Sequence, residues 1–101
     1  MAASKLPPEV LRIIGAGEGV FSSEADQDVA RLDIEWDDVV AVASSAEWRK
    51  RTRDAEGAAE YVEAVRGRDT HGRKLYTAGK PMQVEGEGTR WYVITIHESD
   101  K

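Results

Sequence analysis

The residues best suited to chemistry are a histidine near the C-terminal end and several cationic side chains before it. RNA can be cleaved through its own 2′-hydroxyl when a base deprotonates that hydroxyl, an acid protonates the leaving 5′-oxygen, and cations stabilise the developing charge. Histidine is the side chain best suited to proton transfer near neutral pH, which makes His97 the first candidate. Lys50, Arg73 and Lys74 are candidates for charge stabilisation, and Tyr76 for stacking on a base or donating a proton.

The distribution of charge also favours the second half of the chain for contact with a polyanion. Residues 1–46 contain nine acidic and three basic side chains, a balance of −6, whereas residues 47–101 contain ten acidic and eleven basic ones, a balance of +1. A dipolar surface of this kind lets a basic side meet a polyanion although the net charge is −5. Ordinary solvated charge is an equally good reading of the composition. The candidates for substrate binding are Arg49, Arg51, Arg68, His71, Arg73 and Lys74.

Metal, thiol and nucleotide sites of the common kinds have no counterpart in this sequence. The absence of cysteine excludes a disulfide framework and thiolate ligands. The two histidines are far apart in the chain, and we expect the paired acids Asp37 and Asp38 to be surface groups that stabilise a helix start. The glycine-rich segment 15–19 follows a predicted helix instead of a strand, which argues against dinucleotide binding. We therefore expect no cofactor.

The first half of the sequence predicts three helices. Prolines and a glutamate precede Val10, Leu11 and Ile14, and glycines at 15 and 17 end this first helix. A second helix is expected after the serines at 22–23, with a stripe formed by residues 25, 29 and 32. A third spans about 34–43 and stops near Ser44. By propensity the valine-rich stretch from 39 could be a strand, but the flanking acids and alanines favour a helix.

The second half predicts strands joined by short turns. Segments 61–65, 74–77, 82–84 and 91–97 are β-prone, residues 69–72 form a turn, and 85–88 suit a hairpin loop. The loop from Arg53 to Glu60 is expected to be the softest part of the chain. In the last strand we expect Tyr92, Ile94 and Ile96 to face the core, while Val93, Thr95 and His97 face outward, where a site could be built.

These elements predict a single α+β domain over residues 1–101. Two or three N-terminal helices would pack on one face of a three- to four-stranded antiparallel sheet, with an acidic helical part at 1–46 and a mainly β, locally basic part at 47–101. The start of the chain lacks an apolar leader, and no apolar run is long enough to span a membrane. We therefore expect a cytoplasmic protein with no membrane partner.

From Val10 to Glu98 the sequence resembles the MqsR-type toxins and a related uncharacterised family, both in the RelE-like group of small ribonucleases. The matching stretches are short and cover nearly the whole chain. They are 21–25 (FSSEA), 32–39 (LDIEWDDV), 47–50 (EWRK), 65–76 (VRGRDTHGRKLY) and 92–98 (YVITIHE). The resemblance implies a RelE-like fold and a metal-independent endoribonuclease that acts on mRNA as the toxin of a toxin–antitoxin system.

The resemblance also implies roles for particular residues. In the toxins a lysine after the third helix, a tyrosine on a middle strand and a lysine near the end of the last strand are thought to act on RNA. Lys50 matches the first, Tyr76 lies within about one residue of the second, and the third position carries His97, a possible acid or base. The partners implied are single-stranded RNA and a cognate antitoxin protein, for which the resemblance suggests a zinc-finger segment and a DNA-binding domain.

Two other functions remain open at this stage. The chain carries Glu24 where the uncharacterised relatives usually have a histidine, and Asp28 and Leu32 near positions where they carry arginines. Together with the net charge of −5, this is typical of a catalytically degenerate, RelE-like protein-binding module. The third reading is an inhibitory, antitoxin-like protein whose acidic helices mimic phosphate.

Overall fold

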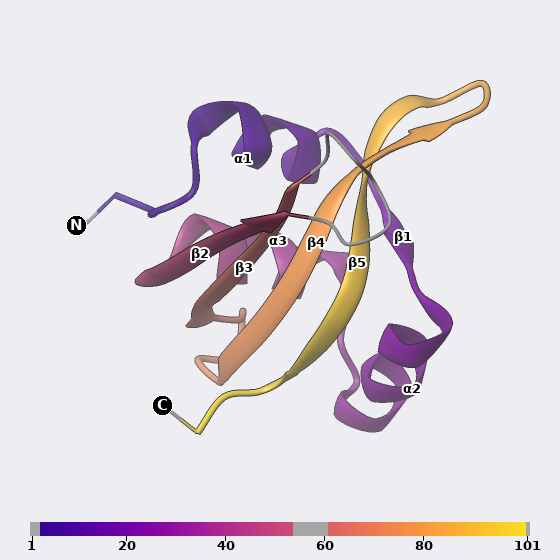
Figure 1. The fold of residues 1–101 in the computed structure, drawn as a ribbon. Helices are drawn as coiled ribbons and strands as arrows, with labels where there is room; N and C mark the ends of the chain where they lie inside the picture. The colour runs from indigo at the N-terminus through magenta and orange to yellow at the C-terminus, as the bar shows by residue number, and fades with distance from the viewer. Residues whose placement is uncertain (1–2, 54–60, 101) are drawn as a thin grey trace.

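The computed structural model describes residues 3–53 and 61–100, and within them the chain forms three helices and a five-stranded mixed sheet (Figure 1). The α+β class predicted from the sequence is therefore confirmed. The elements, in chain order, are α1 (Pro8–Gly15), β1 (Val20–Phe21), α2 (Ser23–Leu32), α3 (Trp36–Ser44), β2 (Trp48–Arg53), β3 (Tyr61–Arg68), β4 (Lys74–Val84) and β5 (Gly88–Glu98).

The sheet differs from the prediction in strand number and direction. Its order is β1-β5-β4-β3-β2, and β1 pairs parallel with β5 while the other pairs are antiparallel. The four strands β2–β5 are antiparallel as expected, but the fifth strand, β1, and its parallel pairing were not predicted. Strand β1 has two residues, too few for any alternation, and it lies in the half expected to be helical. Strand β2 has the sequence WRKRTR, which shows no hydrophobic alternation.

The first two helices begin where the capping residues predict, whereas α3 begins at Trp36, two residues later than expected. Pro8 occupies the first position of α1, and the Ser22 side chain accepts a hydrogen bond from the Ala25 amide at the start of α2. Glu35 and Asp38 form a capping box at the start of α3. The valine-rich stretch is thus helical, as the flanking residues indicated. None of the helices in the described part of the chain is long and apolar enough to cross a membrane.

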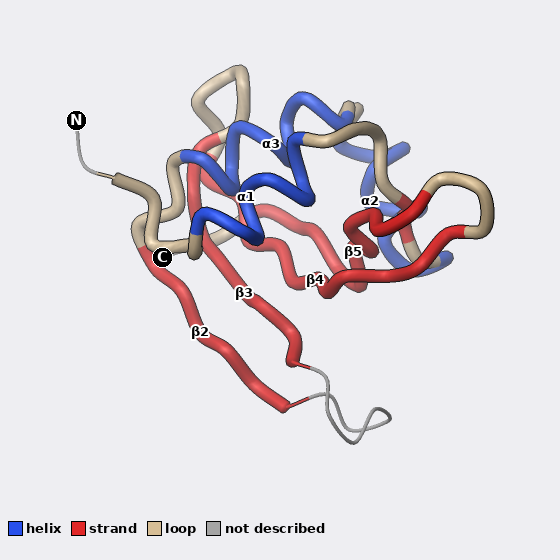
Figure 2. Tube along the Cα trace, turned by 90° about the horizontal axis from the view of Figure 1, so that it is seen from above, coloured by secondary structure: helices blue, strands red, loops and turns tan. Residues whose placement is uncertain are grey.

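The helices leave one face of the sheet uncovered. Figure 2 shows α1 and α3 on the same side of the strands, and α2 lies beside β5 at the β1 edge. The buried core lies between this helical layer and the sheet, where Val39 and Val42 of α3 are in one cluster with Leu75, Val93 and Ile96. We call the opposite side of β2–β5 the open face. Side chains of these four strands that point away from the helices lie on the open face.

A β-bulge corrects the predicted faces of the last strand. Ala78 pairs with Thr95, but the next residue, Gly79, pairs with Val93, so Ile94 is passed over. Val93 is therefore turned to the core and fully buried, and Tyr92 is only partly buried. Thr95 and His97 lie beyond the bulge and keep the outward orientation that was expected. The predicted soft loop falls outside the described residues, except for Arg53, which ends β2.

Candidate nucleic-acid interface

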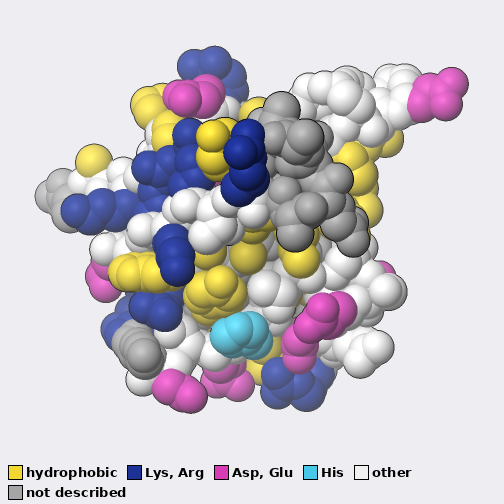
Figure 3. Space-filling model, viewed as in Figure 1, with side chains coloured by type: hydrophobic (Ala, Val, Ile, Leu, Met, Phe, Trp, Pro, Cys, Tyr) yellow, Lys and Arg dark blue, Asp and Glu magenta, His cyan; other side chains and the backbone are white. Residues whose placement is uncertain are grey.

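Four residues from four neighbouring strands form a continuous row across the open face. Trp48 of β2 pairs with Arg66 of β3, Arg66 pairs with Tyr76 of β4, and Tyr76 pairs with His97 of β5. Residues in register on adjacent strands point to the same side of a sheet, so their side chains meet. We call Trp48, Arg66, Tyr76 and His97 the aromatic–cationic row. Figure 3 views this face, where hydrophobic side chains, a histidine and several Lys and Arg side chains gather together.

Stacking contacts connect the members of the row. The Arg66 guanidinium carbon lies 4.0 Å from the centre of the Trp48 ring and 5.9 Å from the centre of the Tyr76 ring. The centres of the Trp48 and Tyr76 rings are 6.2 Å apart. The Tyr76 and His97 rings are stacked, with their centres 4.9 Å apart and an angle of 20° between their planes. The row therefore offers three π-systems and one cation on a single surface.

The imidazole of His97 is exposed and its tautomer follows from a backbone contact. Its Nδ1 lies 2.8 Å from the carbonyl oxygen of Glu98, and because a carbonyl only accepts, Nδ1 carries the proton in this hydrogen bond. In the neutral ring Nε2 then has a free lone pair. His97 lies in a shallow hollow of about 280 Å³. The other residues that line this hollow are Arg66, Tyr76, Glu98, Ser99 and Asp100. A substrate in this hollow would meet a potential base at Nε2.

Three of the predicted cations share this face with the row. Lys50 is two residues after Trp48 on β2, which places it on the same side of the sheet, where it pairs with Ala64. Arg68 is two residues after Arg66, and it pairs with Lys74, which is two residues before Tyr76. The structure therefore brings together Lys50, Arg68 and Lys74 with Tyr76 and His97.

Arg49 and Arg51 are turned to the helical side, where both bind the carboxylate of Glu63. Arg49 donates to the two carboxylate oxygens at 3.0 and 2.9 Å, and Arg51 donates twice to Oε2 at 3.1 and 2.7 Å. Burial alone would raise the pKa of Glu63, but the hydrogen bonds and charges of the two arginines outweigh it and lower the pKa below its ordinary value. Glu63 therefore stays ionised in the folded protein, and its ion pairs hold β2 on β3.

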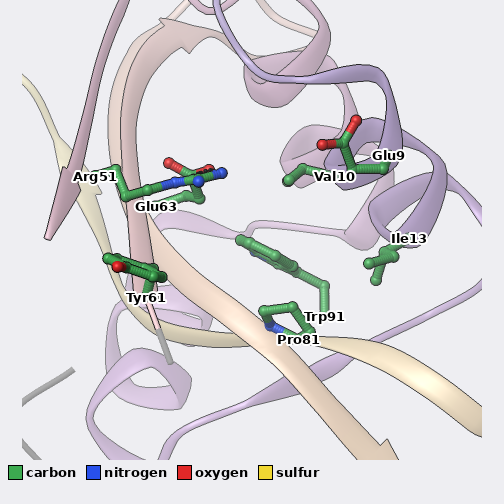
Figure 4. Close-up of a pocket in the computed structure, with 8 residues that line it drawn as sticks. All are labelled: Glu9, Val10, Ile13, Arg51, Tyr61, Glu63, Pro81 and Trp91. Atoms are coloured by element: carbon green, nitrogen blue, oxygen red, sulfur yellow. Dashed lines mark hydrogen bonds and ion pairs between the residues drawn. The ribbon is translucent and has the colours of Figure 1, made fainter. Parts of the chain in front are cut away.

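This ion pair forms one wall of a cavity of about 340 Å³ between α1 and the sheet. Figure 4 shows Arg51 and Glu63 on one side, Val10 and Ile13 of α1 on the other, and Trp91 between them. The cavity lies on the helical side of the sheet. Its residues are therefore separate from the aromatic–cationic row.

Arg73 and His71 also lie away from the row. The Arg73 Nε donates to the Asp69 carboxylate at 2.6 Å, and its Nη1 donates to the Leu32 carbonyl at 2.8 Å, which joins the turn before β4 to the end of α2. Burial would raise the pKa of Asp69, but the hydrogen bonds from Arg73 and the His71 amide lower it. His71 is an exposed residue of this turn.

Asp38 is a buried structural group, contrary to the expectation that it is a surface acid. It is 2% exposed, accepts a hydrogen bond from the Glu35 amide at the start of α3, and accepts two more from the amide and hydroxyl of Thr70. Burial would raise its pKa, but these hydrogen bonds lower it. Asp38 therefore joins α3 to the β3–β4 turn.

The sequence analysis did not identify Trp48 and Arg66 as site residues, although both belong to the aromatic–cationic row. The available signal was the alternation of residue types: Trp48 with Lys50, and Arg66 with Arg68, are pairs spaced by two, the period of a strand face. That signal becomes useful only when 48–53 is recognised as a strand. Within the described ranges, no group of three or more His, Asp or Glu side chains is arranged to hold a metal ion.

Comparison with known proteins leaves the site to be interpreted from its geometry: no family model, no curated protein and no solved structure matches this chain.

Proposed function

We propose that this protein is a metal-independent endoribonuclease that binds single-stranded RNA on its open face and cleaves it next to His97. The observation that carries the proposal is the aromatic–cationic row, which crosses four strands and ends at an exposed imidazole. Under this proposal the protein acts on cytoplasmic mRNA as the toxin of a toxin–antitoxin system.

Single-stranded RNA fits this surface better than a duplex does. Unpaired bases can stack on aromatic rings and on a guanidinium plane, and each stacked base contributes about 1–3 kcal/mol. Trp48, Tyr76 and Arg66 provide such planes, and Lys50, Arg68 and Lys74 provide positive charge for the backbone phosphates. The bases of a duplex are already stacked on each other and would not reach these rings.

The proposed reaction is an attack of the 2′-oxygen on the adjacent phosphorus. His97 Nε2 takes the proton of the 2′-hydroxyl, the new bond between the 2′-oxygen and phosphorus forms, and the bond to the 5′-oxygen breaks. That 5′-oxygen takes a proton from the solvent in front of the open face. The products are a 2′,3′-cyclic phosphate and a 5′-hydroxyl. Arg66 replaces Arg73 as the cation that stabilises the phosphorane, because Arg73 is bound to Asp69. Lys50, on β2, holds a phosphate farther along the RNA strand.

The direct test is cleavage of a labelled single-stranded RNA by the purified protein in the presence of EDTA. We expect cleavage to 2′,3′-cyclic phosphate ends and its loss in His97→Ala. Thr89→Ala, on the opposite end of β5, should cut at the normal rate. Expression in bacteria should stop growth and should be neutralised by a co-expressed antitoxin. RNA left intact at high protein concentration, together with normal growth, would exclude the proposal.

A protein-binding module without catalysis is the second candidate. It is favoured by the ion pairs of Arg49, Arg51 and Arg73, which occupy three of the six side chains predicted to bind substrate. In that case Lys50→Ala and His97→Ala would leave any toxicity unchanged while a partner protein still binds.

A further inference from the structure

Three cationic side chains, Arg66, Arg68 and Lys74, lie together at one corner of the open face. Arg49, Arg51 and Arg73 each bind a carboxylate. Among the described residues, Arg66, Arg68 and Lys74 form no ion pair with a carboxylate: Arg66 lies on Trp48, and Arg68 donates to a backbone carbonyl. Within the described ranges, these three side chains therefore keep their positive charges without a carboxylate partner, and they lie side by side around one hollow.

These three residues surround a hollow of about 200 Å³, which we call the cationic hollow. Its lining residues are Glu47, Trp48, Arg66, Gly67, Arg68 and Lys74. With one acidic and three basic side chains, the hollow has a formal charge of +2. It is large enough for a phosphate group and lies directly beside the Trp48 ring.

The backbone of the cationic hollow is held in place by α3. The Arg68 amide donates to the Ser45 hydroxyl at 2.8 Å, and the Arg68 guanidinium donates to the Gly72 carbonyl at 3.0 Å. Gly67 allows this close approach, because a Cβ there would lie 2.3 Å from the Val42 carbonyl oxygen. The cationic groups are therefore attached to a fixed frame, which lowers the entropic cost of binding an anion.

We propose that the cationic hollow binds a terminal phosphate monoester of RNA. This inference rests on the proposed function and specifies its substrate as RNA that ends in a phosphate. A monoester carries close to two negative charges at neutral pH, which matches the charge of the hollow, whereas an internal phosphodiester carries one. A 5′-phosphate and a 3′-phosphate share this chemistry, and the experiment below separates them.

The position of the cationic hollow connects it to the proposed reaction. Arg66 lines both this hollow and the hollow that contains His97. Arg66 is on β3 and His97 is on β5, so the backbones at these two residues are two strand spacings apart, about 10 Å. A phosphate held at Arg66, Arg68 and Lys74 would therefore fix the end of the strand close to the bond that is cleaved.

The experiment measures binding to the His97→Ala protein, so that no cleavage interferes. Adenosine 5′-monophosphate, adenosine 3′-monophosphate and adenosine are titrated while backbone amide resonances are followed by NMR. We expect one monophosphate to bind at least tenfold more tightly than adenosine, with shifts at residues 66–68 and 74. Lys74→Gln and Arg68→Gln should each weaken binding about tenfold, Lys74→Arg should restore it, and Arg12→Gln on α1 should leave it unchanged.

The outcomes separate this inference from the proposed function. Equal binding of adenosine and both monophosphates, or binding that does not change in Lys74→Gln and Arg68→Gln, overturns the phosphate subsite even if the wild-type protein cuts RNA. Binding of an acidic peptide in place of the monophosphates overturns it as well. Monophosphate binding that depends on Lys74 supports the subsite, and if RNA then stays intact the failure lies with the proposed cleavage.

Discussion

The imidazole of His97 lies flat on the ring of Tyr76, with 4.9 Å between the ring centres and 20° between the planes. The two residues are register partners on β5 and β4, so the backbone fixes the contact as well as the side chains. With Nδ1 bound to the Glu98 carbonyl, the ring has one face on Tyr76 and one nitrogen free. Tyr76 therefore acts as a positioning residue for His97 in the proposed reaction.

Replacing Tyr76 should separate the effect of its ring from that of its hydroxyl. Tyr76→Phe keeps the stacking surface, so RNA cleavage should stay close to the wild-type rate. Tyr76→Leu removes the flat partner of His97, and the single-turnover rate should fall about tenfold or more. If the cleavage rate fell equally in Tyr76→Phe and Tyr76→Leu, the hydroxyl, and not the stacking, would support the reaction.

Glu63→Gln should destabilise the fold without touching the open face. The substitution removes a buried negative charge that accepts four hydrogen bonds from Arg49 and Arg51, and the expected loss is about 2 kcal/mol because both arginines reach solvent. Urea unfolding at pH 7 measures this loss. Glu87→Gln, in the exposed β4–β5 turn, is the matched control and should unfold at the wild-type urea concentration.

Lowered carboxylate pKa values also determine how stability depends on pH. The pKa of Glu63 is below its ordinary value of 4.5, and those of Asp38 and Asp69 are below 3.8. A lowered pKa means that the folded state binds protons less readily than the unfolded state, so the stabilisation is complete above the ordinary pKa and is lost as the pH falls below it. The free energy of unfolding should therefore fall below about pH 4.5, and less steeply in Glu63→Gln. A parallel pH dependence in both proteins would contradict this assignment.

The sequence carried enough information for the helices and most of the long strands, because their signals are local. Ser22 and the Glu35–Asp38 box define helix starts, and apolar spacing defines the buried stripes. Strand β2 has no such signal, since its register with β3 is maintained by the ion pairs to Glu63, a residue ten or more positions away. The bulge at Gly79 depends on the pairing of two strands and on Trp91, which no local pattern reveals.

The candidate site was predictable only in part for the same reason. Lys50, Tyr76 and His97 were selected by residue type, and the sheet brings them to one face. The sequence does not reveal which cations are already paired. Arg73 and Lys74 are neighbours in the chain, yet Arg73, in the turn before β4, is bound to Asp69, whereas Lys74, the first residue of β4, lies on the open face.

The hydrogen bonds between Asp38 and Thr70 should couple α3 to the β3–β4 turn. Thr70→Val removes the hydroxyl donor and should cost about 1.5 kcal/mol, while Asp38→Ala also removes the helix cap and should cost about 3 kcal/mol. In a double-mutant cycle the combined loss should be smaller than the sum by about 1 kcal/mol. Thr52→Val, at an exposed position of β2, provides the control for the loss of a threonine hydroxyl. Strict additivity would show that the two residues do not stabilise the same contact.

Gly79→Ala should be among the most damaging small substitutions in the sheet. A Cβ at this position would lie 2.4 Å from the Trp91 Nε1 and 2.6 Å from the Tyr92 carbonyl oxygen, so either the indole or the β4–β5 pairing must shift. We expect a loss of about 2 kcal/mol in urea unfolding, together with a change in tryptophan fluorescence as the buried Trp91 moves. Gly15→Ala provides the matched control, because nothing lies within 4 Å of a Cβ there and alanine favours the helix by up to about 1 kcal/mol. If Gly79→Ala unfolded at the same urea concentration as the wild-type protein, β4 could not approach Trp91 as closely as this bulge requires.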